Sequence, residues 1–198
     1  MTRAVAARRF VIVAALGFFH LVMPTLLNGV QAASFRRAGV AQEEIARRVE
    51  GWVADGKKDF LFVQGSDGLA FYAPYFFLDR DAGPAHWWLG ALGKGQRSIT
   101  HEADGSLLLE AADHDLLNGV FPPLLRERMP EVGEVVRLEG LTITVEARGP
   151  QGPTRIRFLP DRPVQLVGWG PEGLTLLETP DVGASLYLPW YAGPTEAL

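Results

Sequence analysis

The chain has no cysteine, which excludes disulfides, thiolate metal sites and a cysteine nucleophile. It also lacks the G-x-x-x-x-G-K-[ST] phosphate loop, the G-x-S-x-G nucleophile elbow and the H-E-x-x-H metal helix. No dense basic patch occurs and the formal net charge is −4, which argues against nucleic acid as a partner. We therefore expect a protein that is not an enzyme.

The longest apolar run extends from Phe10 to Ala33, contains no charged residue and follows Arg8 and Arg9. As a helix it would be long enough to cross a hydrocarbon core of about 30 Å. The run predicts a transmembrane helix over residues 10–33. A second interpretation stays open: a secretory signal cleaved after Ala32, since a basic start, an apolar centre and small residues at the end are typical of signal peptides.

Polar residues within the run share one helical face with Gly17, and we expect this face to contact other subunits of a membrane complex. The contact residues predicted there are Gly17, His20, Asn28 and Gln31. His20 lies near the middle of the run, where an imidazole could bind the iron of a haem or the magnesium of a chlorophyll. A hydrogen bond from His20 to a neighbouring helix is the alternative.

Basic residues flank the run on both sides, so the positive-inside rule gives no clear orientation. The export-like start favours a bacterial inner-membrane protein with its N-terminus inside and the remainder in the periplasm. This organisation divides the chain into a basic segment (1–9), a transmembrane helix (10–33), an amphipathic linker helix (34–56) and a β-rich soluble domain (57–198).

Residues 41–54 show helical periodicity, with Ile45, Val49, Trp52 and Val53 on one face. Two interpretations of this helix remain. It lies on the membrane surface with Trp52 at the interface, or it packs on the soluble domain.

The soluble domain shows strand patterns, with alternation clearest at Leu141–Val145 and a hairpin signal at Asp104 and Gly105. A helix is expected over 69–78. The expected strands are 59–64, 86–92, 97–103, 106–111, 135–139, 141–147, 155–159, 164–169, 174–178 and 186–188. The predicted fold class is a single N-terminal transmembrane helix plus a mainly β (α+β) soluble domain, a small barrel or sandwich with one βαβ-like unit at its start.

The stretches 130–145 and 154–158 resemble the β-rich C-terminal region of some uncharacterised bacterial multi-span membrane proteins. Their cadence is also similar to the small transporter-associated domain of the CorC/HlyC family. The first resemblance implies no known activity. The second normally accompanies a nucleotide-binding module that this chain lacks, and neither resemblance implies a functional residue.

One cluster could carry chemistry: His101, Glu102, Asp104, Asp113, His114 and Asp115. If the hairpin brought His101 and His114 together, they could form a metal site with a carboxylate. In the competing interpretation, Asp104 belongs to the turn and Asp113 caps a helix.

Aromatic residues are dense between Phe71 and Trp88 and again near Trp190. They form either a packed core or an exposed surface that docks on a partner, in which case Trp52, Trp87, Trp88 and Trp190 make contacts. Our leading hypothesis is a non-catalytic accessory subunit of a photosynthetic or respiratory membrane complex, in contact with other subunits and the bilayer. The alternatives are a binding module for a small ligand or an envelope partner, and a metal-dependent enzyme.

Overall fold

The structure is a computed structural model that describes residues 23–65, 73–78, 80, 83–112, 114–117, 128–191 and 193. For residues 23–31 and 34 only the backbone is described. The chain separates into two compact units, Met1–Val40 and Ala41–Leu198.

The transmembrane helix expected over 10–33 is wrong. Residues 10–22 lie outside the described residues, and residues 23–33 belong to α2 (Met23–Ala54), which continues through Arg36, Arg37 and further charged residues. No helix in the described part of the chain is both long and apolar enough to cross a bilayer. This finding contradicts the single-pass and inner-membrane assignments, including the N-in orientation, that depended on the helix.

In the described part of the chain, the other elements are one short 3₁₀ helix and ten strands. The 3₁₀ helix, η2, spans Ala73–Phe77. The strands are β1 (Asp59–Gln64), β2 (His86–Leu89), β3 (Arg97–His101), β4 (Leu107–Ala111), β5 (Val135–Leu138), β6 (Leu141–Arg148), β7 (Pro153–Pro160), β8 (Gln165–Gly170), β9 (Gly173–Leu177) and β10 (Ser185–Leu188). Every predicted strand is present, so the expectation of a β-rich domain is confirmed.

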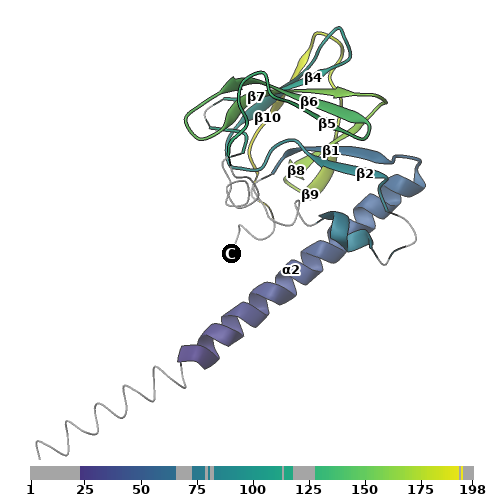
Figure 1. The fold of residues 1–198 in the computed structure, drawn as a ribbon. Helices are drawn as coiled ribbons and strands as arrows, with labels where there is room; N and C mark the ends of the chain where they lie inside the picture. The colour runs from purple at the N-terminus through teal and green to yellow at the C-terminus, as the bar shows by residue number, and fades with distance from the viewer. Residues whose placement is uncertain are drawn as a thin grey trace, which may run out of the picture. The chain divides into compact units, whose positions relative to one another are not determined.

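Two sheets form the domain (Figure 1). Sheet A has the strand order β2-β1-β8-β9, and β1 pairs in parallel with both β2 and β8. Sheet B has the order β10-β3-β4-β7-β6-β5 and is antiparallel throughout. Two separate sheets correspond to the sandwich, rather than the barrel, of the predicted alternatives.

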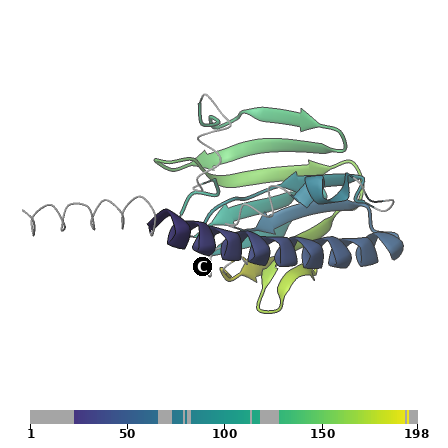
Figure 2. The same cartoon turned by 90° about the horizontal axis from the view of Figure 1, so that it is seen from below.

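Sheet A is covered on both faces. One face packs against the C-terminal part of α2 (Figure 2). There, Ile45 and Val49 are buried in one cluster with Phe60, Phe62 and other side chains. Residues 41–54 of α2 therefore pack on the domain, the second of the two interpretations of this segment. The sequence predicts a helix over 69–78. The structure has the 3₁₀ helix η2 within this range, and residues 69–72 lie outside the described residues.

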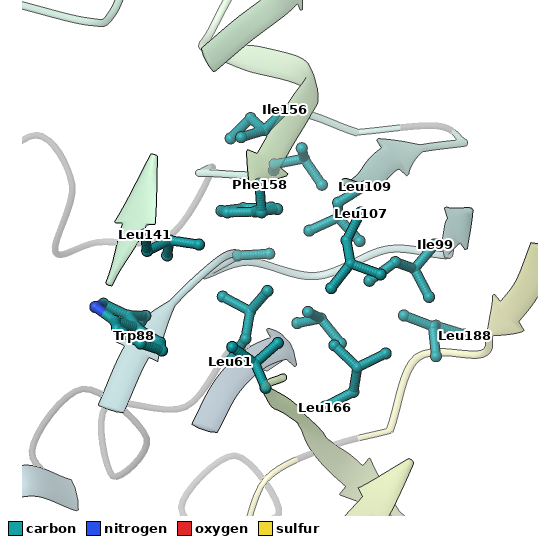
Figure 3. Close-up of a cluster of buried hydrophobic side chains, with 14 residues drawn as sticks. Leu61, Trp88, Ile99, Leu107, Leu109, Leu141, Ile156, Phe158, Leu166 and Leu188 are labelled. Carbon is teal, nitrogen blue, oxygen red and sulfur yellow. The ribbon is translucent and has the colours of Figure 1, made fainter. Parts of the chain in front are cut away.

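The other face of sheet A packs on sheet B. Leu61, Trp88 and Leu166 meet Leu109 and Phe158 of sheet B in one cluster of buried side chains (Figure 3). The side chain of Gln64 also donates to the carbonyl of Pro189, which joins β1 to the segment after β10. The sandwich is therefore held by an apolar core with a polar tie near its margin.

Candidate functional site

One end of the sandwich gathers the turns that follow β3, β5 and β7, the connection from β9 to β10, and the first residues of β1 and β2. We call this region the loop end. Loops carried by a rigid scaffold are common places for binding residues. Here the scaffold brings Asp59, His86 and Arg162 together, although they are far apart in the sequence.

Asp59 and His86 open adjacent parallel strands and are partners in the register of β1 and β2. Their side chains meet, with 2.6 Å between the His86 Nδ1 and the Asp59 Oδ1. A carboxylate can only accept, so the Nδ1 carries the proton and donates to Asp59. This contact orients the ring and leaves the Nε2 as an acceptor when the imidazole is neutral.

Arg162 lies in the turn between β7 and β8 and pairs with the second carboxylate oxygen. Its Nε is 3.0 Å from the Asp59 Oδ2. Its Nη2 is 2.9 Å from the His86 Nδ1, but that nitrogen already donates to Asp59 and cannot accept from Arg162. Both oxygens of Asp59 are thus occupied, one by an imidazole and one by a guanidinium.

The His86 ring is held from its face as well. It stacks on Trp88 with 5.0 Å between the ring centroids and an interplanar angle of 9°. The Nε2 lies 3.8 Å from the Oε2 of Glu139, whose side chain is 86% exposed. In the described part of the chain His86 makes no hydrogen bond to a hydroxyl, so the arrangement does not include an activated serine or threonine.

A cavity of about 510 Å³ adjoins Arg162 at the loop end. Its walls come from the β3–β4 hairpin, the β7–β8 connection and the segment after β9: His101, Gly105, Leu107, Pro160, Asp161, Arg162, Pro163, Val164, Gln165 and Thr179. The volume falls in the usual range for small-molecule sites, roughly 300–1,000 Å³. The polar side chains among these residues are therefore candidates for ligand recognition.

The cavity offers both donors and acceptors. The His101 Nδ1 is 3.0 Å from the carbonyl oxygen of Pro180 and donates to it, which leaves the Nε2 as an acceptor. The Gln165 side chain makes no hydrogen bond to another described residue. Arg162 supplies a guanidinium that is about half exposed, and Asp161 a carboxylate. A small ligand with hydroxyl or amide groups fits this chemistry.

Asp104 stabilises the turn between β3 and β4, as one of the two interpretations of the cluster predicts. Its Oδ1 accepts from the Ser106 backbone N–H at 2.9 Å and from the Ser106 hydroxyl at 2.6 Å. These hydrogen bonds, the hydroxyl contact first, lower the pKa of Asp104 below its ordinary value. Gly105 follows with a φ of 82°, a conformation that suits glycine in this tight turn.

The histidines considered for a metal site do not come together. His101 pairs with Leu107 beside the turn of the β3–β4 hairpin, whereas His114 follows the opposite end of β4. Asp113 lies outside the described residues, and Asp115 accepts from the Gln151 backbone N–H at 2.8 Å. No group of three histidine or acidic side chains in the described part of the chain could hold a metal ion.

The aromatic residues expected at a docking surface lie mostly in the cores. Trp88 is 7% exposed in the core between the sheets. Trp52 and Trp87 are partly buried against the cluster under α2, where each ring lies 5.9 Å from Phe60. Trp190 is partly exposed, and the Lys94 ammonium lies 5.7 Å from its ring centroid.

The residues expected to contact a membrane complex are not placed by the structure. Gly17 and His20 lie outside the described residues, and only the backbone of Asn28 and Gln31 is described, within α2. Their proposed contacts, including haem or chlorophyll at His20, stay predictions.

Comparisons of the chain with protein-family models, curated proteins and solved structures found no match. The resemblances stated from the sequence thus stay predictions. Any functional assignment has to come from the site itself.

Proposed function

We propose that residues 41–198 form a non-catalytic binding module whose loop end holds a small polar ligand. The observation that supports this function is the cavity of about 510 Å³ beside Arg162, lined by donors and acceptors that the fold leaves available. Recognition, rather than reaction, is favoured because Asp59, His86 and Arg162 are paired with one another.

A binding module for a small ligand was one of the alternatives considered from the sequence. The structure favours a binding module over a surface that docks through tryptophans. Trp88 is in the core, and Trp52 and Trp87 pack against a core cluster. Membership of a larger complex stays a prediction that does not compete with ligand binding.

The test uses the full chain and a panel of monosaccharides, free amino acids and nucleosides, screened by ligand-observed NMR. The informative variant is Gln165→Leu, because the amide has no partner among the described residues and its loss removes a recognition group without breaking a contact. Gln151→Leu is the matched control, since Gln151 is exposed in the turn between β6 and β7, at the opposite end of the sandwich.

We expect at least one ligand of the panel to bind, Gln165→Leu to weaken that binding at least five-fold, and Gln151→Leu to leave it unchanged. Thermal unfolding of both variants checks that the fold is intact. If Gln165→Leu and the unsubstituted chain bound the ligand equally well, the loop end would not be the binding site. If no ligand of the panel bound, the result would contradict the proposed function.

A further inference from the structure

A second cavity, of about 270 Å³, lies between α2 and the turn from β8 to β9, at the end of sheet A opposite the loop end. The helix contributes Ala41, Glu44, Ile45 and Arg48, and the strands and turn contribute Trp169, Gly170, Pro171, Glu172, Gly173 and Leu174. All of these residues belong to the unit Ala41–Leu198. The cavity shares no residue with the loop end and is independent of the function proposed above.

The guanidinium of Arg48 is fixed at this cavity by two backbone carbonyls. Its Nη1 donates to the Leu174 oxygen at 3.1 Å and its Nη2 to the Glu172 oxygen at 2.8 Å. The carbonyls hold a cation in place without neutralising its charge. A guanidinium positioned in this way is pre-organised to bind an anion.

A carboxylate already occupies the remaining edge of this guanidinium. The Nε and Nη2 of Arg48 lie 3.1 and 2.7 Å from the Oε1 of Glu44, whose side chain is 48% exposed. A pair of this kind, four residues apart on an accessible helix face, contributes little to stability. Glu44 therefore shows that the Nε and Nη2 edge of Arg48 binds a carboxylate. Another carboxylate could displace Glu44 with little loss of stability.

The turn leaves space around this pair. Gly173 has a φ of 95°, and a Cβ built there would lie 3.8 Å from the Arg48 Nη2 and 3.9 Å from the Glu44 Oε1. A side chain extending from that position would enter the region around the guanidinium. Glycine thus keeps the turn tight and leaves the space beside the Arg48–Glu44 pair free of a side chain from this position.

Trp169 supplies a second, separate indication of a ligand. Its side chain is 2% exposed, it lines the cavity, and its indole Nε1 is buried with no hydrogen-bond partner among the described residues. A buried donor without an acceptor loses its hydrogen bond to water and gains none in return, so native structures usually supply a partner such as a bound molecule. An acceptor oxygen held in the cavity would supply this partner.

We infer that this cavity binds a small monocarboxylate with an apolar body. The carboxylate takes the place of Glu44 on Arg48 and offers its second oxygen toward the Trp169 side of the cavity. The apolar body packs on the walls formed by Ile45, Pro171 and Leu174. The volume is just below the usual range for ligand sites, which restricts the occupant to a small molecule.

Isothermal titration of the full chain with sodium octanoate at pH 7 tests this inference, with 1-octanol as the probe that has the same chain and no carboxylate. We expect saturable binding of octanoate and no binding of octanol. Arg48→Met keeps an apolar stem and should weaken octanoate binding at least ten-fold. Trp169→Phe keeps a ring without the N–H and should weaken it several-fold.

Glu44→Gln removes the competing carboxylate and should tighten octanoate binding several-fold. Arg47→Met is the matched control, because Arg47 is exposed on the same helix and lines neither cavity. Its affinity should equal that of the unsubstituted chain.

The inference is overturned by the absence of octanoate binding, by equal binding of octanol, or by affinities that Trp169→Phe and Glu44→Gln leave unchanged. These two variants keep the test decisive if Arg48→Met does not fold. Binding by Glu44→Gln alone also overturns it, because the cavity would then be closed in the natural sequence.

Discussion

Sheets A and B share a core but differ in what covers their second face. Sheet A lies between residues 41–54 of α2 and sheet B, and five consecutive residues of β1, Phe60 to Gln64, are buried. Sheet B has one face on the core, and its other face carries ion pairs such as Arg155 with Glu110. The same domain thus contains one sheet with two dry faces and one sheet with a single dry face.

The difference follows from side-chain alternation along a strand. A strand covered on both faces tolerates apolar residues at every position, whereas a strand with one wet face alternates. β1 reads Asp-Phe-Leu-Phe-Val-Gln, and β7 contains Arg-Ile-Arg-Phe. The contrast teaches that the number of covered faces can be judged from the strand sequence before the partner layers are known.

The comparison predicts its largest changes in the free energy of unfolding when two neighbouring residues of one strand are truncated, first in sheet A and then in sheet B. In β1, Leu61 and Phe62 are both fully buried on opposite faces. Leu61→Ala should lower the free energy of unfolding by about 2–5 kcal/mol and Phe62→Ala by about 3–5 kcal/mol, because each leaves a cavity. Urea unfolding followed by circular dichroism measures both values.

The matched pair in sheet B is Phe158 and Leu159 in β7. Phe158 is 1% exposed and Leu159 is 43% exposed. Phe158→Ala should cost about 3–5 kcal/mol, whereas Leu159→Ala should change stability by no more than about 0.5 kcal/mol. A cost for Leu159→Ala as large as that for Leu61→Ala would show that the outer face of sheet B is also covered.

A smaller effect is expected at Gly90, which follows β2 and lies close to side chains of both sheets. A Cβ added to Gly90 would lie 3.1 Å from the Phe158 ring, 3.2 Å from the Phe62 carbonyl oxygen and 3.4 Å from the Leu61 Cδ1. Gly90→Ala should therefore destabilise the domain by about 1–3 kcal/mol through overpacking. The same urea titration measures it.

Gly51→Ala is the control for this prediction. Gly51 is exposed within α2, and a Cβ there would meet nothing within 4 Å. Alanine favours the helix by about 0.5–1 kcal/mol, so this variant should be more stable than the unsubstituted chain. The two glycine variants thus shift stability in opposite directions, and a shift in the same direction would contradict the close approach at Gly90.

The strands could be predicted from the sequence because their patterns are local. Alternation at Leu141–Val145, the apolar run in β1 and the turn at Asp104 and Gly105 each specify structure over a few neighbouring residues. The N-terminal apolar run was misread because its composition alone does not show where a helix continues. In the structure, its last residues belong to α2, which extends into the charged segment up to Ala54.

The candidate site could not be predicted because it depends on pairing between distant strands. Asp59 and His86 each begin a predicted strand, and that position was the only available signal. Nothing local indicates that β1 and β2 are parallel neighbours or that Arg162 reaches Asp59 from the β7–β8 turn. The His101 and His114 hypothesis failed for the same reason, since hairpin register places these residues at opposite ends.

The smallest expected effect concerns Asp104, in the turn that joins β3 and β4 of sheet B, and the dependence of stability on pH. Asp104 has a pKa below its ordinary 3.8 in the folded chain because it accepts from Ser106, and Arg157 lies 3.8 Å away. Its contribution to stability is complete above pH 3.8 and is lost as the pH falls from there through the lower folded value, since the unfolded chain takes up the proton first.

Asp104→Asn should therefore reduce the steepness with which stability falls at acid pH, measured as the urea midpoint between pH 7 and pH 2. Asp181→Asn is the control, because it removes the same charge from an exposed position in the turn before β10 and leaves the Ser106 contacts in place. If Asp104→Asn left the fall in stability at acid pH unchanged, the pH dependence would have to come from groups other than Asp104.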